Sequence, residues 1–450
     1  MKAGPPPLGG PAAFSGSGAH AGARDDRADN RPVSNAARRI GLGTVFALLV
    51  GTLGIGYAIK APCASGDWTD GRQYARLCYS DNVHQLETEQ LTGGRLPFLD
   101  ACRTQEGIEC DEYPVLTMWT MRAAAWISGP SITDYFTTSS IMMWIAAFVI
   151  ALLLYVLVGD RVLYFVLAPT LAIYATMNWD LLAVALATGG TFLYLRRRDG
   201  WAGVLLGLGA AAKVFPALLV VPFVAGRFHA REPDRAIRLA WAAVGTWLAI
   251  NLPFVLVAPS AWWEFFRYNG GRFADWDSLW YVACERATGQ TCSQTDLVNG
   301  ASLIMFVAWA GLVWVLKARR EPGFARWTLG FPILVLFLLT NKVYSPQFSL
   351  WLLPWFALAF PNLWLFVAFE AADVAVFVTR FSWFGRYTGI EGGLSGIPVG
   401  VFEMAVVVRA AILVWCVVWW LRGRHRAAAS ARASAEPAAR ESDPEEVTAG

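Results

Sequence analysis

Long apolar segments constrain the fold of this chain more than any other feature of its sequence. About twelve of them follow one another, and roughly 20 apolar residues suffice for a helix to cross a bilayer. They lie near residues 40–59, 139–158, 161–177, 179–195, 201–212, 214–226, 238–257, 299–317, 327–340, 347–360, 363–379 and 400–421. Only 16% of the 450 residues are charged, whereas soluble domains carry roughly 25%. The sequence therefore predicts an all-α polytopic membrane protein with about twelve transmembrane helices.

Clusters of arginine between these segments test the number of crossings, because basic residues concentrate in cytoplasmic loops. The clusters lie at residues 38–39, 196–198, 227–238, 317–326 and 422–426. All of them fall on the cytoplasmic side if residues 200–226 and 327–361 each cross the membrane twice, as pairs of short helices. We therefore expect two short, broken hairpins, with a single tilted span in each place as the alternative.

Each predicted hairpin carries a lysine and a proline near its tip. GAAAKVFPALL contains Lys213, and NKVYSPQFSLWLLP contains Lys342. Ionisable residues within a membrane are costly to bury and are functional candidates, and the proline frees backbone groups beside each lysine. We expect both tips to face an extracytoplasmic cavity and to bind an anionic head group. A lysine that only extends to the membrane interface is the alternative.

The chain divides into one membrane domain and two tails. Residues 1–38 and 423–450 are rich in small and charged residues without apolar periodicity, which is typical of disorder, and both tails are expected in the cytoplasm. Residues 39–422 form the membrane domain. Its long extracytoplasmic loops are expected at residues 61–139, directly after the first span, and 258–299.

Cysteine positions support this topology, because disulfides form in oxidising compartments. Six of the seven cysteines lie in the two loops predicted to be outside, and CRTQEGIEC and CERATGQTC have the same spacing. Free small cysteines remain the alternative. The pattern predicts three disulfides, which are Cys102–Cys110, Cys284–Cys292 and Cys63–Cys78.

Polar candidates for chemistry concentrate where the predicted spans meet the outer loops. A base that takes a proton from a sugar hydroxyl is commonly a carboxylate, and the first outer loop supplies Asp70, Asp81 and Glu112. Asp180, in MNWDLL at the boundary of a short span, is a candidate for orienting a substrate. Arg272, in the second outer loop, is a candidate phosphate ligand beside the two lysines.

Signatures of other functions do not fit the chain. Asp275 and Asp277 form a DxD pattern, but their loop is predicted to lie outside, away from nucleotide sugars. The four histidines are scattered, and no P-loop or HExxH pattern is present. A net charge of +3 with dispersed basic clusters excludes nucleic acid as the partner. The sequence predicts no metal-ligand set and leaves a requirement for a divalent metal open.

The two lysine hairpins, the acidic loop with YSDN and DEYP, and the RFADWDSLW loop together resemble the polytopic GT-C glycosyltransferases of family 87. The resemblance extends from about residue 40 to 422, and the family includes polyprenyl-phosphate-mannose-dependent α-1,2-mannosyltransferases. It implies a GT-C fold in the plasma membrane. It also implies inverting transfer of a sugar, mannose or arabinose, from a polyprenyl-phosphate carrier to an extracytoplasmic glycolipid or glycan. The lipid-linked sugar would be a substrate, and no cofactor is implied.

The resemblance also implies roles for individual residues. Family members place a catalytic aspartate shortly after the first span, where Asp81 in YSDNVHQL is the nearest match. Asp70 is a rival, because the tyrosine that follows the family's aspartate is replaced in this chain. Lys213 and Lys342 match the lysines that would meet the donor phosphate, and Arg272 matches the family's loop arginine less closely.

Further polar and aromatic residues are expected to shape the substrate site. They are Glu112, Tyr113, Asp180 and Tyr344. A membrane transporter or flippase of a lipid-linked or anionic substrate is the alternative function, because broken hairpins with polar tips also build transport sites. The long loop before the second span and the lack of a clear inverted repeat argue against it.

Overall fold

The computed structural model describes residue 1 and residues 39–64, 70–103, 110–289, 292, 294–390 and 392–424. Apart from residues 1, 423 and 424, the two predicted tails lie outside the described residues. Every regular element in the described part of the chain is a helix. The predicted all-α class is therefore confirmed for that part.

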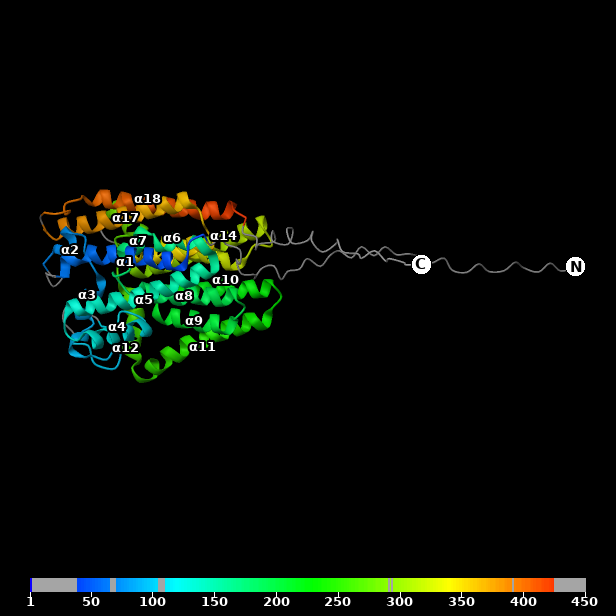
Figure 1. Ribbon diagram of the computed structural model, residues 1–450, viewed down its shortest axis with the longest axis horizontal. Helices are drawn as coiled ribbons and strands as arrows, with labels where there is room; N and C mark the ends of the chain where they lie inside the picture. The colour runs from blue at the N-terminus through cyan, green and yellow to red at the C-terminus, as the bar shows by residue number, and fades with distance from the viewer. Residues whose placement is uncertain are drawn as a thin grey trace, which may run out of the picture.

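Five helices among the described residues are long and apolar enough to cross a membrane. They run along the length of the bundle, beside α17 (Leu363–Tyr387) and several shorter helices (Figure 1). The five are α1 (Leu42–Ala64), the continuous run Ile132–Val166 that begins with α5 (Ile132–Val158), α11 (Pro233–Val257), α14 (Thr295–Arg320) and α18 (Val399–Arg422). The protein is an all-helical, multi-span membrane protein.

The two predicted hairpins consist of short helices. The first is α9 (Asp199–Ala212) followed by α10 (Phe215–His229), with Lys213 in an extended conformation between them. The chain leaves the helix at Lys213 and starts a new one at Phe215, because Pro216 has no N–H to continue the first. The second hairpin contains η4 (Arg326–Leu329), α15 (Gly330–Thr340), η5 (Pro346–Trp351) and α16 (Leu353–Leu358).

One expected span is broken into short pieces. Residues 161–177 contain the end of η3 (Gly159–Val162), then α6 (Leu163–Val166) and α7 (Pro169–Tyr174), and α8 (Asp180–Leu195) follows. Pro169 starts α7, so a continuous helix through this region would lose a hydrogen bond. The structure therefore differs from the single span expected there, and the total of about twelve crossings stays a prediction.

The two long segments between spans, which follow α1 and α11, gather at one end of the bundle, where α2, α3, α4 and α12 lie together (Figure 1). These segments hold α2 (Arg72–Ala75), α3 (Asp81–Thr88), η2 (Leu91–Gly93), α4 (Val115–Ser128), α12 (Pro259–Gly271) and α13 (Leu279–Thr288). The six loop cysteines are paired as the sequence spacing suggested. The disulfides are Cys63–Cys78, Cys102–Cys110 and Cys284–Cys292.

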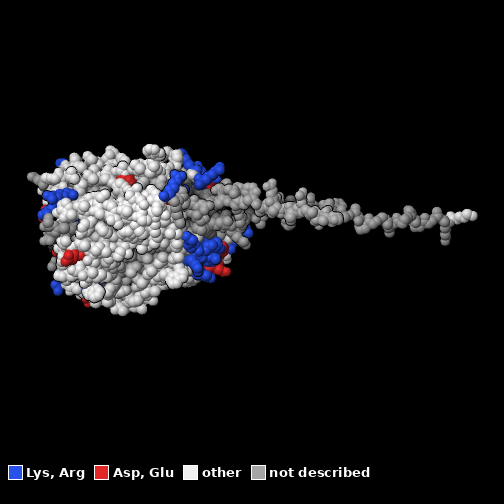
Figure 2. Space-filling view, viewed as in Figure 1, with Lys and Arg blue, Asp and Glu red and all other residues white. Residues whose placement is uncertain are grey.

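Charged side chains lie at the two ends of the body, with few on the broad belt between them (Figure 2). Exposed arginines lie in the turn from α8 to α9, in the turn from α10 to α11 and the start of α11, and at the end of α14. They are Arg196, Arg198, Arg231, Arg238, Arg319 and Arg320. Such a belt is suited to lipid, because charged side chains are costly within a bilayer.

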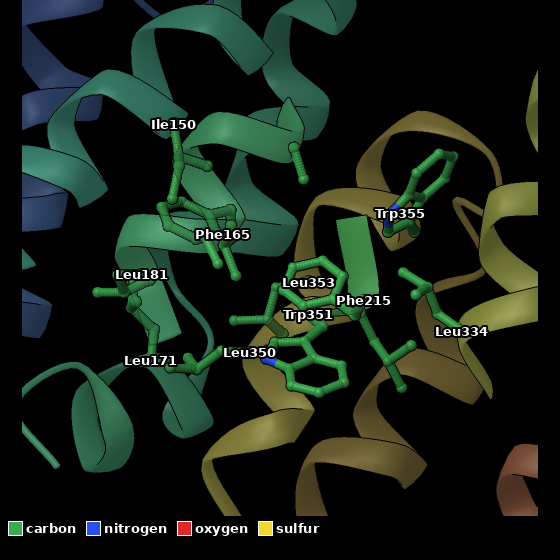
Figure 3. Close-up of a cluster of buried hydrophobic side chains, with 14 of the residues drawn as sticks. Ile150, Phe165, Leu171, Leu181, Phe215, Leu334, Leu350, Trp351, Leu353 and Trp355 are labelled. Atoms are coloured by element: carbon green, nitrogen blue, oxygen red, sulfur yellow. The ribbon is translucent and has the colours of Figure 1, made fainter. Parts of the chain in front are cut away.

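The tips of the two hairpins pack against each other in the core. The rings of Phe215 and Trp351 stack with centroids 4.3 Å apart, and Phe348 stacks on Trp351 at 4.2 Å. Leu350 and Leu353 extend the same cluster (Figure 3). This packing brings residues about 130 positions apart in sequence to one place beneath the outer loops.

Small residues allow α9 to lie directly on α11. A Cβ atom at Gly203 would come within 2.3 Å of the Leu239 carbonyl oxygen, and one at Gly207 within 2.4 Å of the Ala243 carbonyl oxygen. Close helix contacts of this kind are typical of membrane bundles.

We expect Gly203→Ala to force these helices apart and to lower the free energy of unfolding by about 1–3 kcal/mol, the usual cost of overpacking. Gly245→Ala on α11 is the matched control, because no atom lies within 4 Å of the added Cβ. Thermal unfolding of both variants in one detergent measures the difference. Equal melting temperatures would contradict the close contact.

Candidate active site

A cavity of about 1470 Å³ lies at the loop-bearing end of the bundle. Charged side chains of both signs line it, which makes it the default location for a polar substrate. Its carboxylates are Asp81, Asp100, Asp111, Glu112, Glu264 and Asp275, and its arginines are Arg95, Arg267, Arg272 and Arg380. None of the described lysines is part of its wall.

Asp81, the first residue of α3, is held in this wall by two side-chain amides. Asn178 Nδ2 donates to Asp81 Oδ2 at 2.9 Å, and Gln347 Nε2 donates to the same oxygen at 3.0 Å. The donors are 97 and 266 residues away in sequence, so the tertiary fold fixes the orientation of this carboxylate. A carboxylate has about four acceptor positions, so Asp81 can still accept a hydrogen bond from a substrate hydroxyl.

Tyr113 lies beside Asp81 in the same network. Its hydroxyl oxygen accepts hydrogen bonds from Gln85 Nε2 at 2.7 Å and from Asn178 Nδ2 at 2.9 Å. Burial, and then the nearby Asp81 carboxylate, raise the pKa of Tyr113 well above its usual value. The hydroxyl therefore stays protonated and can donate to a substrate.

The peptide before Asp81 is fastened to the end of α1. Fully buried Lys60 donates from Nζ to the Tyr79 carbonyl oxygen at 2.6 Å, and Cys63 is bonded to Cys78. Ser80 Oγ adds a hydrogen bond of 2.9 Å to the Thr176 carbonyl oxygen. The position of Asp81 therefore depends on the first span as well as on the loop that carries Asp81.

Glu112 is placed by a buried carboxylate of the same loop. Glu89 accepts the backbone N–H groups of Asp111 at 2.6 Å and Glu112 at 3.1 Å, and Asp111 forms an ion pair with Arg95. Burial raises the pKa of Glu89 to about 8. The buried contacts of Glu89 and Asp111 therefore hold the loop so that Glu112 and Tyr113 line the cavity.

Arginines supply positive charge to the wall of the cavity. Arg380 of α17 forms ion pairs with Asp277 and, at 3.4 Å, with Asp275, and Arg409 of α18 lies 3.9 Å from Asp277. Burial would raise the pKa of Asp275, but Arg380 and Arg272 outweigh it and the pKa is lowered. Both aspartates of the DxD pattern are thus engaged by arginines.

Lys213 is not among the residues that line the cavity, and its expected contact with a donor phosphate stays a prediction. Its Nζ donates to both carboxylate oxygens of Asp180 at 2.8 Å, and Trp351 Nε1 donates to Asp180 Oδ1 at 2.7 Å. The ammonium group also lies 4.7 Å from the centre of the Phe348 ring. Lys213 and Asp180 therefore form a buried ion pair that joins the two hairpin tips behind Tyr113.

Lys342 is likewise absent from the wall, and it supports the loop that carries Arg272. Its Nζ donates to the carbonyl oxygens of Gly270 at 2.8 Å and Arg272 at 2.7 Å, and its own carbonyl accepts the Asp275 N–H at 2.8 Å. Because these bonds fix the backbone around Arg272, Lys342 acts on the cavity indirectly.

Two other expected site residues also lie apart from the cavity. The Tyr344 hydroxyl pairs with Ser349 at 3.1 Å, and Arg409 lies over the Tyr344 ring at 3.8 Å. Asp70 forms an exposed ion pair with Arg72. Neither Tyr344 nor Asp70 lines the cavity.

The structure thus brings together Asp81, Glu112, Tyr113 and Arg272 from the expected set. The residues that the sequence reasoning missed in this wall are Gln85, Gln347 and Arg380, and Asn178 directly behind them. The sequence could have pointed to Arg380, because it is an ionisable residue directly after an apolar segment, and such residues are functional candidates in membrane proteins. Asn178 and Gln347 adjoin the motifs of Asp180 and Lys342, but an isolated amide gives no comparable signal.

An apolar cavity of about 410 Å³ adjoins the polar one and shares Phe98 and Tyr113 with it. Its other walls come from α9, α10, α11 and α12. The apolar lining includes Leu206, Ala210, Val220, Val221, Val244, Trp247 and Phe266. A lipid chain can occupy such a space while its polar head lies in the charged cavity.

The described residues contain no group of three or more His, Cys, Asp or Glu side chains that could hold a metal ion. The wall of the cavity offers the carboxylate of Asp81, the protonated phenol of Tyr113 and the guanidinium groups of its arginines. A carboxylate suits removal of a hydroxyl proton, and arginine suits a phosphate.

We expect Lys213→Met to destabilise the protein, because Asp180 would remain fully buried without its cation. Removing one partner of a buried ion pair costs about 3–5 kcal/mol, and the double variant Lys213→Met/Asp180→Asn should recover part of that loss. Thermal unfolding and donor binding of the three proteins measure the effect. Unchanged stability with lost donor affinity would instead indicate a direct phosphate contact.

Comparison with known proteins identifies the family. Residues 113–340, about half of the chain, match the model of glycosyltransferase family 87. No curated protein matches significantly. Among solved structures, the chain is similar to ArnT from Cupriavidus metallidurans in the apo state, with 14% identity and a TM-score of 0.40, over 75% of this chain and 72% of that one. By the family match, this chain belongs to glycosyltransferase family 87, whose members are membrane enzymes that use lipid-linked sugar donors.

Proposed function

We propose that this protein is an inverting transferase that moves a sugar, mannose, from a polyprenyl-phosphate carrier to an extracytoplasmic glycolipid or glycan. The observation that carries the proposal is the position of Asp81. Two amides hold this carboxylate in a cavity that also contains Arg272 and Arg380 and that adjoins an apolar cavity.

In this proposal the acceptor hydroxyl attacks the anomeric carbon of the donor while Asp81 takes its proton. A C–O bond to the sugar forms, and the bond from the anomeric carbon to the phosphate oxygen breaks. The electron pair leaves with polyprenyl phosphate. One displacement by one nucleophile inverts the anomeric configuration, and it requires a single carboxylate as base.

Arg272 and Arg380 are proposed to stabilise the negative charge that grows on the leaving phosphate. Guanidinium groups match phosphate oxygens in pairs, and preformed charges that face the leaving group lower the barrier. In this proposal Lys342 supports the backbone around Arg272. The ion pair of Lys213 with Asp180 supports the position of Tyr113, whose ring centre lies 5.5 Å from the ammonium group. Glu112 and Tyr113 are proposed to contact the sugar hydroxyls.

The proposed location is the plasma membrane, with both termini in the cytoplasm and the cavity outside. The three disulfides at the cavity end support an oxidising environment there. Exposed arginines at the opposite end support a cytoplasmic face. The transporter alternative finds no support in the family match.

The central test compares Asp81→Asn with Asp70→Asn in the same assay. The assay supplies purified protein in nanodiscs with polyprenyl-phospho-mannose and a panel of mannosides, and it follows the release of polyprenyl phosphate. General base catalysis contributes about 10²–10⁴-fold, so we expect a loss of that size for Asp81→Asn. Asp70→Asn should retain activity, because Asp70 pairs with Arg72 away from the cavity.

Normal turnover by Asp81→Asn would remove this residue from the role of base. Polyprenyl-phospho-arabinose, supplied in parallel, tests the sugar. A preference for the pentose would overturn the mannose assignment, but it would not change the assignment of Asp81 as the base.

A further inference from the structure

A second polar cavity shares part of its wall with the charged cavity. Its volume is about 540 Å³, and α2, α3, η2 and the start of α5 contribute to its walls. In Figure 1, the label of α3 lies between those of α2, which contributes to this cavity, and α12, which contributes to the apolar one. Tyr79 and His84 line both this cavity and the charged one.

The two shared residues place the second cavity directly behind the proposed base. Tyr79 precedes Asp81 by two residues, and His84 follows it by three on α3. The two cavities therefore meet at Tyr79 and His84. A molecule long enough to pass Tyr79 and His84 would contact both spaces at once.

The lining of the second cavity is suited to hydroxyl groups. Gln73 Oε1 is buried and has no hydrogen-bond partner in the described structure, and Glu87 and Thr92 add polar groups. Buried acceptors without partners are costly, so a ligand that donates a hydrogen bond to Gln73 would remove that cost.

Aromatic rings form one face of the same cavity. Tyr74 stacks on Tyr79 with ring centroids 6.2 Å apart, and Tyr79 stacks on Phe381 at 4.8 Å. Flat rings beside amide and carboxylate groups suit an uncharged sugar ring. The lining contains no lysine or arginine, and so it lacks the charge that a second phosphate would need.

We propose that this cavity is a carbohydrate subsite that binds the acceptor sugar next to the one being glycosylated. The proposal rests on the transferase function proposed above and adds to it the class of acceptor, an oligosaccharide head group of at least two sugars. Gln73 and Glu87 accept hydrogen bonds from its hydroxyls, and Tyr74 packs against its ring. The terminal sugar passes Tyr79 and His84 to reach Asp81.

The test is binding of a mannotriose to the purified full-length protein in nanodiscs, followed by saturation-transfer NMR. Thr92→Trp fills the cavity from its exposed rim, and Gln73→Ala removes the unpaired acceptor. Leu96→Trp is the matched control, because this exposed residue of the same loop does not line the second cavity. We expect at least about tenfold weaker binding for Thr92→Trp and a smaller loss for Gln73→Ala, with Leu96→Trp unchanged.

The transfer assay separates failure of the subsite from failure of the transferase function. If the subsite is correct, Thr92→Trp raises KM for the mannotriose and leaves KM for the polyprenyl-phosphate donor unchanged. Equal binding by wild type, Thr92→Trp and Gln73→Ala, or no binding by the wild type, would overturn the subsite. Absence of donor cleavage by the wild type would overturn the proposed function, whichever result the binding experiment gives.

Discussion

The ion pairs of Arg380 hold the catalytic end of this protein together. Arg380 lies on α17, within the bundle, while Asp275 and Asp277 belong to the loop between α12 and α13. Charges this deep are costly unless they are paired, so the loop must stay closed over the helix. The loop contributes Arg272, Asp275 and Trp276 to the wall of the charged cavity that also contains Asp81.

The two lysines also have partners within the protein, as buried charges require. Lys213 is paired with Asp180, and Lys342 donates to two backbone carbonyls. Each ammonium group joins two segments of the chain, and Arg272 and Arg380 line the charged cavity beside their aspartate partners. Guanidinium groups are better suited to that position, because they stay charged and bind phosphate in a planar, two-point geometry.

The sequence predicted the elements more successfully than it predicted their contacts. Hydropathy and arginine clusters located the long spans and the two broken hairpins, because both patterns are local. The broken region at 161–177 was missed, since an apolar run does not reveal that Pro169 restarts the helix. Asp81 was singled out by the family resemblance, which places an aspartate shortly after the first span. Its partners Asn178 and Gln347 come from distant segments, and their convergence depends on packing that a single sequence does not encode locally.

The central claim is that a lipid-linked phosphate binds between Arg272 and Arg380, with Asp81 on the far side of the sugar. A cryo-electron microscopy structure of the protein in nanodiscs with polyprenyl phosphate tests this claim most directly. The account predicts phosphate oxygens within hydrogen-bond distance of both guanidinium groups and the prenyl chain in the apolar cavity between α9, α10 and α11. A phosphate bound at Lys213 or Lys342, or a prenyl chain outside that cavity, would contradict it.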